Sequence, residues 1–181
     1  MSGKRKLLLH VCCAPCASHV IEFLMPEYEI TLLFYNPCIE PLDEYLKRKE
    51  QLHILLSKLP LGEQVGFFDC EYANDDFVAI AEGLRGVPEG GARCAGCFRL
   101  RLSETARLAN LHGFEVFATT LTVSVHKNAA MINDIGESLV NSDGVVYLSS
   151  DFKRQGGYQR SIELSKQFGL YRQKTCGCLL V

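Results

Sequence analysis

Apolar residues recur along this chain with two spacings, one typical of buried strands and one typical of amphipathic helices. Short apolar runs of strand length occur at residues 6–11, 30–35, 65–69, 116–119 and 145–148. Longer stretches with apolar residues every three or four positions predict helices at about residues 15–24, 41–59, 75–84, 93–111, 128–140 and 161–168. Because the two kinds of element alternate, we expect an α/β fold. We predict a single doubly wound domain over residues 1–181, with a five-stranded, mainly parallel sheet.

Cysteine side chains directly follow the first predicted strand. Residues 7–11 are typical of a buried parallel strand, and Cys12, Cys13 and Cys16 come next, with Pro15 suited to the first turn of a helix. Ligands of open α/β sheets bind at the carboxyl ends of the strands. We therefore expect the functional site at this edge of the sheet, with thiols where many α/β proteins place glycines and a phosphate.

The composition is that of an ordinary globular protein, with 48% hydrophobic and 22% charged residues. No apolar run approaches the ~20 residues that cross a bilayer. The leucines at residues 7–9 are too few for the apolar region of a signal peptide. We therefore expect a cytoplasmic protein without membrane contact.

Positive charge gathers at the end of the chain. Residues 151–181 hold six basic and two acidic side chains, whereas the whole chain has a net charge of −2. A basic end on an acidic body is a plausible contact for a polyanion. An exposed helix face with lysines on it would produce the same charge pattern.

The chain has nine cysteines, an odd number that excludes a full set of structural disulfides. In a reducing compartment this number indicates metal or redox chemistry. Three groups stand out: the group at residues 12–16, the pair Cys94-x-x-Cys97 and the pair Cys176-x-Cys178. Lone cysteines are usually small buried hydrophobes, and we expect this of Cys38 and Cys70.

The Cys94-x-x-Cys97 spacing lets two thiolates face one ion from a single helical turn, as in zinc and iron–sulfur proteins. The start of a helix beside Arg93, Arg99 and Arg101 favours thiolates at these positions. Adjacent cysteines such as Cys12 and Cys13 are less usual for structural zinc. Cys16 is equally suited to be a ligand, a neighbour of the ligands or a bystander.

The second pair, Cys176-x-Cys178, is a separate signal. A disulfide between residues two apart closes a small strained ring, and strain makes such a bond labile and redox-active. The same two thiols could instead bind a metal.

Several longer blocks complete the pattern. They are Leu-Leu-His-Val-Cys-Cys-Ala-Pro-Cys at 8–16, Phe-Tyr-Asn-Pro at 34–37, Glu-Tyr-Leu-Lys-Arg-Lys at 44–49, Arg-Cys-x-x-Cys-Phe-x-x-Arg-Leu at 93–102, Thr-Thr-Leu-Thr-Val-Ser-x-His-Lys-Asn at 119–128, Asp-Phe-Lys-Arg at 151–154, Gly-Tyr-Gln-Arg-Ser at 157–161, Tyr-Arg-Gln at 171–173 and Cys-Gly-Cys at 176–178. Together these blocks resemble the QueH-type epoxyqueuosine reductases over nearly the whole chain. Cys38 is a departure from the family pattern, which has Asn there, and it is a candidate for a further thiol near the site.

The resemblance implies the last step of queuosine formation, in which the epoxide of the modified wobble guanosine of tRNA is reduced to an alkene with loss of water. It implies a HUP-like (adenine-nucleotide-hydrolase-like) α/β fold, a [4Fe–4S] cluster, a possible additional mononuclear iron, an external electron donor and no cobalamin. By position, Cys12, Cys13, Cys94 and Cys97 match the cluster ligands. Cys176 and Cys178 match a redox pair.

Reduction of an epoxide also needs a proton donor and a surface that holds the substrate. Candidates for the acid are His126, Asp69 and Asp151, because each lies in a loop at the end of a predicted strand. His10 lies inside the first strand and is more typical of a core histidine. Basic side chains near the C-terminus could bind phosphates, and Tyr158 or Phe152 could stack on an unpaired base. The basic candidates are Lys127, Lys153, Arg154 and Arg160.

Three other functions fit parts of the pattern. An ATP-dependent tRNA-modifying enzyme of similar fold would need a glycine-rich phosphate loop after the first strand, where this chain has Val-Cys-Cys-Ala-Pro-Cys. A structural zinc protein would leave the Cys-Gly-Cys tail unexplained. A thiol–disulfide oxidoreductase would not need the other thiols.

Overall fold

A five-stranded sheet with the order β3-β2-β1-β4-β5 forms the centre of the protein, and all of its strands are parallel. The structure is a computed structural model and describes residues 3–140 and 144–179. The strands are β1 Arg5–His10, β2 Tyr28–Leu33, β3 Gly66–Phe68, β4 Val116–Thr119 and β5 Val146–Tyr147. The order reverses between β1 and β4, so the sheet is doubly wound as predicted.

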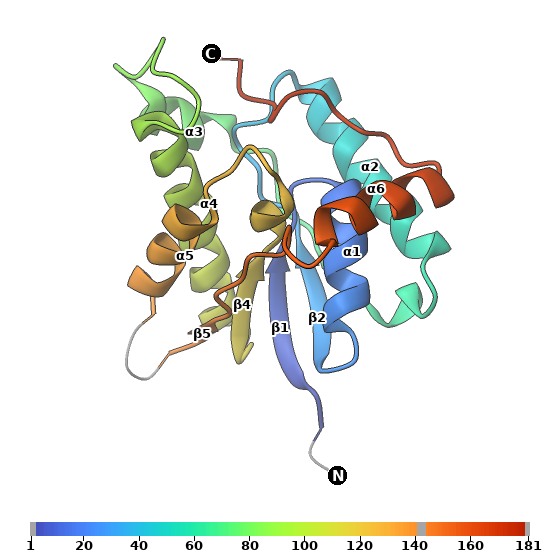
Figure 1. Ribbon diagram of the computed structural model, residues 1–181. Helices are drawn as coiled ribbons and strands as arrows, with labels where there is room; N and C mark the ends of the chain where they lie inside the picture. Colours follow the sequence, from blue (N-terminus) through green and yellow to red (C-terminus); the bar gives the residue numbers. More distant parts are fainter. Residues whose placement is uncertain (1–2, 141–143, 180–181) are drawn as a thin grey trace.

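Helices cover both faces of this sheet (Figure 1). On one face lie α1 (Ala14–Leu24), α2 (Leu42–Lys58) and α6 (Gly157–Gln167). On the other lie α3 (Asn74–Ala81), α4 (Ala92–Leu111) and α5 (Ala129–Ser138). Short 3-10 helices span Gly62–Gln64 and Thr120–Val123. Among the described residues, no helix is both long and apolar enough to cross a membrane.

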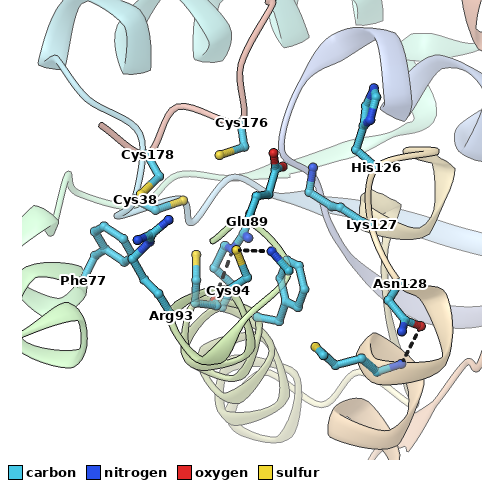
Figure 2. Close-up of a pocket in the computed structure, with 15 residues that line it drawn as sticks. Cys38, Phe77, Glu89, Arg93, Cys94, His126, Lys127, Asn128, Cys176 and Cys178 are labelled. Atoms are coloured by element: carbon cyan, nitrogen blue, oxygen red, sulfur yellow. Dashed lines mark hydrogen bonds between the residues drawn. The ribbon is translucent and has the colours of Figure 1, made fainter. Parts of the chain in front are cut away.

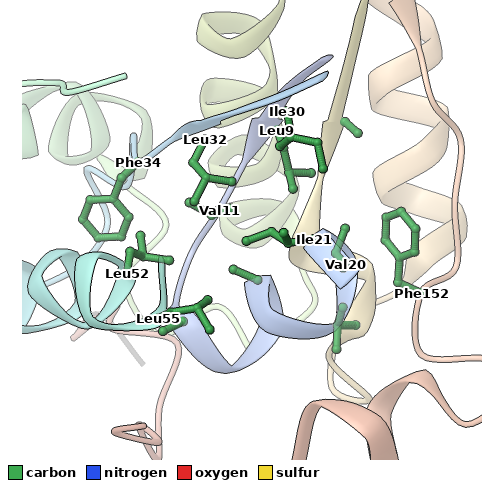
Figure 3. Packing of buried hydrophobic residues seen from close by; sticks show 14 of the residues in the cluster. Leu9, Val11, Val20, Ile21, Ile30, Leu32, Phe34, Leu52, Leu55 and Phe152 are labelled. Carbon is green, nitrogen blue, oxygen red and sulfur yellow. The ribbon is translucent and has the colours of Figure 1, made fainter. Parts of the chain in front are cut away.

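Strand β1 is buried on both sides, as expected for the middle strand of a parallel sheet. Its alternate residues enter two separate cores. Leu7 and Leu9 pack with α1 and α2, whereas Leu8 packs against residues of α4 and α5. Figure 3 shows the first of these cores, where Val20 and Ile21 of α1 lie beneath the strands.

His10, at the end of β1, is a core histidine, as the sequence indicated. It is fully buried, with Nδ1 2.9 Å from Thr119 Oγ1 and Nε2 3.1 Å from the Tyr35 carbonyl oxygen. Burial, with Arg101 nearby, lowers the pKa of His10 to about 4. The ring is therefore neutral and joins β1, β4 and the segment after β2.

Two element boundaries differ from the predicted ones for reasons visible in the structure. Strand β2 ends at Leu33 because its partner β1 ends at His10, which is paired with Leu33. Phe34 and Tyr35 continue the apolar run as buried side chains beyond the sheet. Helix α6 begins at Gly157 rather than Ser161, so Tyr158 lies in its first turn instead of a loop.

Candidate metal and redox site

Cys12, Cys13 and Cys16 meet where β1 gives way to α1. Their Sγ atoms all lie within 4.8 Å of one another, and those of Cys12 and Cys13 are 3.8 Å apart. The carboxyl end of β4 adds Thr120, whose Oγ1 is 3.9 Å from Cys12 Sγ. The group therefore occupies the point where the strand order reverses, which is the usual ligand site of a doubly wound sheet.

The three thiols differ in pKa, and Cys12 is the one that ionises most readily. Hydrogen bonds from Cys13 and Cys16 hold the pKa of Cys12 well below the ordinary cysteine value, and Lys127 adds to this effect. The same interaction with Cys12 raises the pKa of Cys13 to about 12 and raises that of Cys16 as well. One thiolate stabilised by two protonated neighbours is a site that a metal ion can enter by displacing those protons.

The second group of thiols lies at the start of α4. Cys94 Sγ accepts a hydrogen bond from the Gly90 backbone N–H at 3.2 Å. Cys97 is buried, and a hydrogen bond from the Cys38 thiol lowers its pKa to about 7. Cys38 is thus more than the buried hydrophobe expected from its position in the sequence, because it lies within the thiol group.

The third group arrives from the C-terminal segment, which crosses the carboxyl edge of the sheet (Figure 1). Two arginine hydrogen bonds hold it, from Arg48 Nη1 to the Cys176 carbonyl at 3.1 Å and from Nη2 to the Thr175 carbonyl at 3.3 Å. The Glu40 backbone N–H donates to the Gly177 carbonyl at 3.0 Å. Cys176 and Cys178 are therefore docked against the segment that carries Cys38.

The three groups of thiols line two adjoining cavities of about 390 Å³ and about 40 Å³. Cys94, Cys176 and Cys178 border both cavities, the first group borders the larger one, and Cys38 with Cys97 borders the smaller one. Figure 2 shows the sulfur atoms of Cys94, Cys176 and Cys178 turned toward this shared space. The described residues thus bring together eight of the nine cysteines, and only Cys70 lies outside the linings.

Of the three predicted acids, His126 alone borders these cavities. Asp69 forms an ion pair with Lys49, and its side chain is 69% exposed. Asp151 pairs with Lys153 at 2.9 Å and with Arg154 at 2.8 Å. The carboxylate that does line both cavities is Glu89, from the glycine-rich loop before α4.

The predicted basic residues also divide into two sets. Lys127 and Tyr158 line the larger cavity. Lys153 and Arg154 are bound to Asp151, and Arg160 pairs with Glu22 and Glu163. None of these three lines the cavities, and Phe152 is buried in the core.

Several residues at the site were not predicted from the sequence. They are Arg48, Glu89 and Gln173. Arg93 and Arg101, which the sequence places beside the Cys-x-x-Cys pair, line the cavities as expected of groups near these thiols, and they share one face of α4 with Cys97. Arg172 and Lys174, which belong to the basic end of the chain, also line the larger cavity, because Arg48 holds the residues that follow them.

The donor set fits an iron–sulfur or zinc centre. Thiolates from separate segments, one of them a Cys-x-x-Cys pair, are the ligands of both kinds of site. A buried cation, Arg101, also lies beside the thiols, and its positive charge offsets the negative charge of thiolates. The larger cavity leaves room beyond the cysteines, toward Tyr158 and Lys174, for a further ligand.

Comparison with known proteins identifies the relatives of this chain. A sequence model of the family described as epoxyqueuosine reductase QueH matches residues 7–181. Epoxyqueuosine reductase QueH of Streptococcus pyogenes serotype M1 is 41% identical over 180 residues, covering 98% of this chain and 71% of that protein. The protein of the same name from Staphylococcus epidermidis is 41% identical over 182 residues, covering 98% and 76%. Its namesake from Thermotoga maritima is 35% identical over 173 residues, covering 96% and 88%.

Proposed function

The chain belongs to the epoxyqueuosine reductase QueH family, and from this premise we propose that it reduces epoxyqueuosine to queuosine at the wobble position of tRNA. It is an oxidoreductase, as the names of its relatives state. The observation that carries the proposal is the meeting of three thiol groups around one cavity that continues toward basic and aromatic side chains. A tRNA substrate agrees with the cytoplasmic location expected from the sequence.

We assign the ligands of a [4Fe–4S] cluster to Cys12, Cys13, Cys94 and Cys97. The first two lie in a group whose sulfur atoms are within 4.8 Å of one another, and the other two lie near the start of α4. Cys16 belongs to the first group and is the candidate ligand for an additional mononuclear iron. When bound, such a centre supplies electrons one at a time.

Removal of the epoxide oxygen consumes two electrons and two protons and releases water. We assign the two-electron store to Cys176 and Cys178, because a dithiol that closes to a disulfide releases two electrons and two protons. Both thiols border the two cavities, and hydrogen bonds from Arg48 and Glu40 hold their segment in place. An external electron donor would then reopen the disulfide for the next turnover.

Two side chains are placed to deliver a proton to the leaving oxygen. His126 and Glu89 border both cavities. Figure 2 shows the Glu89 carboxylate pointing into the space bordered by Cys94, Cys176 and Lys127. The sequence also predicts Asp69 and Asp151 for this role, but both are held in ion pairs away from the cavities, which favours Glu89 and His126.

The wobble nucleotide would enter the larger cavity past Tyr158. This ring offers a stacking surface, as in proteins that bind unpaired bases. Lys127, Arg172 and Lys174 line the same cavity, and none of the three forms an ion pair with the described residues. They are better placed to bind phosphates than Lys153, Arg154 and Arg160, whose charges are already paired.

The first test is to measure iron, zinc and acid-labile sulfide after anaerobic purification, followed by an assay with tRNA that carries epoxyqueuosine. We expect about four irons and four sulfides per chain, a visible absorption band that bleaches with dithionite, and conversion of the epoxide to the alkene. Stoichiometric zinc without sulfide, together with no conversion, would contradict the proposal and favour a structural zinc protein. Conversion that requires ATP would favour the ATP-dependent alternative.

A further inference from the structure

Arg101 is a cation buried inside the protein. Arg101 is only 4% exposed and lies on α4, one turn after Cys97. Nε donates to the Cys97 carbonyl at 3.3 Å, and Nη1 lies 3.4 Å from Asn36 Oδ1. Among the described residues, no carboxylate forms an ion pair with it. Burial of an unpaired charge is costly, so a compensating anion is expected nearby.

Several thiols lie near Arg101 and interact with its charge. Burial lowers its pKa, but Cys97, Cys38, Cys12 and Cys176 outweigh burial and raise the pKa overall. Arg101 also lines both cavities. Through these two cavities, Arg101 lies beside thiols of all three cysteine groups.

The guanidinium is also held in one position. Asn36, which accepts its hydrogen bond, donates from Nδ2 to the Val11 carbonyl at 2.8 Å and is itself buried. The ring of Phe98 lies under the guanidinium, with 5.5 Å from Cζ to the ring centroid. Because the guanidinium is already in position, it does not have to reorganise when the charge of a neighbouring group changes. Its full electrostatic interaction is therefore available to stabilise added negative charge.

We infer that Arg101 is the counter-charge of the thiolate-bound metal centre and that its fixed positive charge raises the midpoint potential of that centre. The inference rests on the proposed function, because it needs a redox-active cluster on these cysteines. A nearby cation stabilises the reduced, more negative state more than the oxidised one, and low dielectric strengthens the effect. Arg101 is a positioning residue here and need not touch the substrate.

The test compares Arg101→Met and Arg101→Lys with the wild-type holoenzyme. Arg107→Met is the matched control, since Arg107 lies on the same helix with a 59% exposed side chain paired with Glu104. Each protein is titrated anaerobically, and the visible absorption of the cluster reports its reduced fraction. Iron and sulfide content and thermal unfolding are measured in parallel.

We measure the ratio of reduced to oxidised cluster at the potential that is the midpoint of the wild type. In Arg101→Met this ratio should be lower by on the order of tenfold, which corresponds to a midpoint potential lower by about 59 mV for one electron. Arg101→Lys and Arg107→Met should stay close to the wild type. An unchanged midpoint in Arg101→Met would overturn this inference while leaving the proposed function intact. A wild-type protein with no reversible metal-centred transition would overturn both.

A variant that loses its metal is informative as well. If Arg101→Met folds without iron while Arg101→Lys retains it, a charge at this position is required and the inference is supported. If both variants fold with the wild-type melting temperature and lose iron equally, the shape of arginine is what matters, and the inference is wrong.

Discussion

Arg160 on α6 donates two hydrogen bonds to the Glu22 carboxylate on α1, from Nε to Oε2 at 2.9 Å and from Nη2 to Oε1 at 2.7 Å. Because this pair joins two neighbouring helices on the surface, we expect Arg160→Gln to lower the free energy of unfolding by no more than about 1 kcal/mol. Affinity for tRNA should not change. Urea unfolding and a tRNA binding assay check the two expectations. A large loss of tRNA affinity would instead support the substrate-binding role predicted for Arg160 from the sequence.

The same pair predicts a dependence of stability on pH. The hydrogen bonds from Arg160 lower the pKa of Glu22 below its ordinary value of 4.5. The folded state therefore binds this proton less readily than the unfolded state does, so the pair stabilises the fold above pH 4.5 and loses its effect as the pH falls through the lowered pKa. Unfolding curves of wild type and Arg160→Gln should converge at acid pH. A difference that persists there would contradict the ion pair.

Arg172 and Lys174 are expected to bind the RNA backbone. They line the larger cavity without ion pairs among the described residues. Each of Arg172→Gln and Lys174→Gln should weaken binding of an anticodon stem-loop and reduce the slope of log affinity against log salt by about 1. Lys153→Gln is the matched control, because Lys153 is already paired with Asp151. A larger effect from the control than from the two variants would contradict this assignment.

Substitutions of Cys94 and of Cys178 are expected to have different effects on the protein. Cys94→Ala should abolish bound cluster, since it removes a proposed ligand, whereas Cys178→Ala should keep the cluster and stop turnover, since it removes half of the proposed redox pair. Iron and sulfide analysis with the tRNA assay separates the outcomes. If Cys178→Ala also loses the cluster, the tail is a ligand and the division between the two groups is wrong.

Gly177 allows the tail to approach Ile39. Its φ is +103°, and a Cβ there would lie 3.0 Å from Ile39 Cγ1 and 3.1 Å from Ile39 Cα. Gly177→Ala should therefore undock the tail and lower turnover by roughly tenfold or more, which corresponds to an increase of about 1.4 kcal/mol in the activation free energy. Gly169→Ala is the control, because its φ is +62° with no atom within 4 Å of the added Cβ. Equal losses in both would point to backbone strain alone.

Glu89 is the carboxylate expected to matter at this site. Glu89→Gln should lower kcat by roughly 100-fold, the usual effect of losing a general acid, with tRNA binding unchanged. Asp69→Asn is the control, because Asp69 is paired with Lys49 and does not line the cavities. Single-turnover assays over a range of pH measure the effect. A full loss of activity in Asp69→Asn with none in Glu89→Gln would contradict the role of Glu89 and support Asp69 as the general acid, as predicted from the sequence.

The sequence by itself determined the architecture and the sulfur chemistry. The alternation of strand and helix periods predicted a parallel doubly wound sheet, and all the strands of the described sheet are parallel. It also placed Cys12, Cys94 and Cys176 in loops and helix starts that later proved to meet at one edge. These conclusions need only local patterns, because the carboxyl ends of parallel strands converge wherever the fold forms.

Only the tertiary structure decided which charges serve the site. Arg160 and Glu22 are 138 residues apart, and Asp69 is neutralised by Lys49 of another element. Arg101, one of several arginines near Cys94 and Cys97 in the sequence, is shown to be buried and to line both cavities only by the fold. The physical reason is that charge pairing depends on distance in space and on desolvation, and neither is encoded in the spacing of residues along the chain.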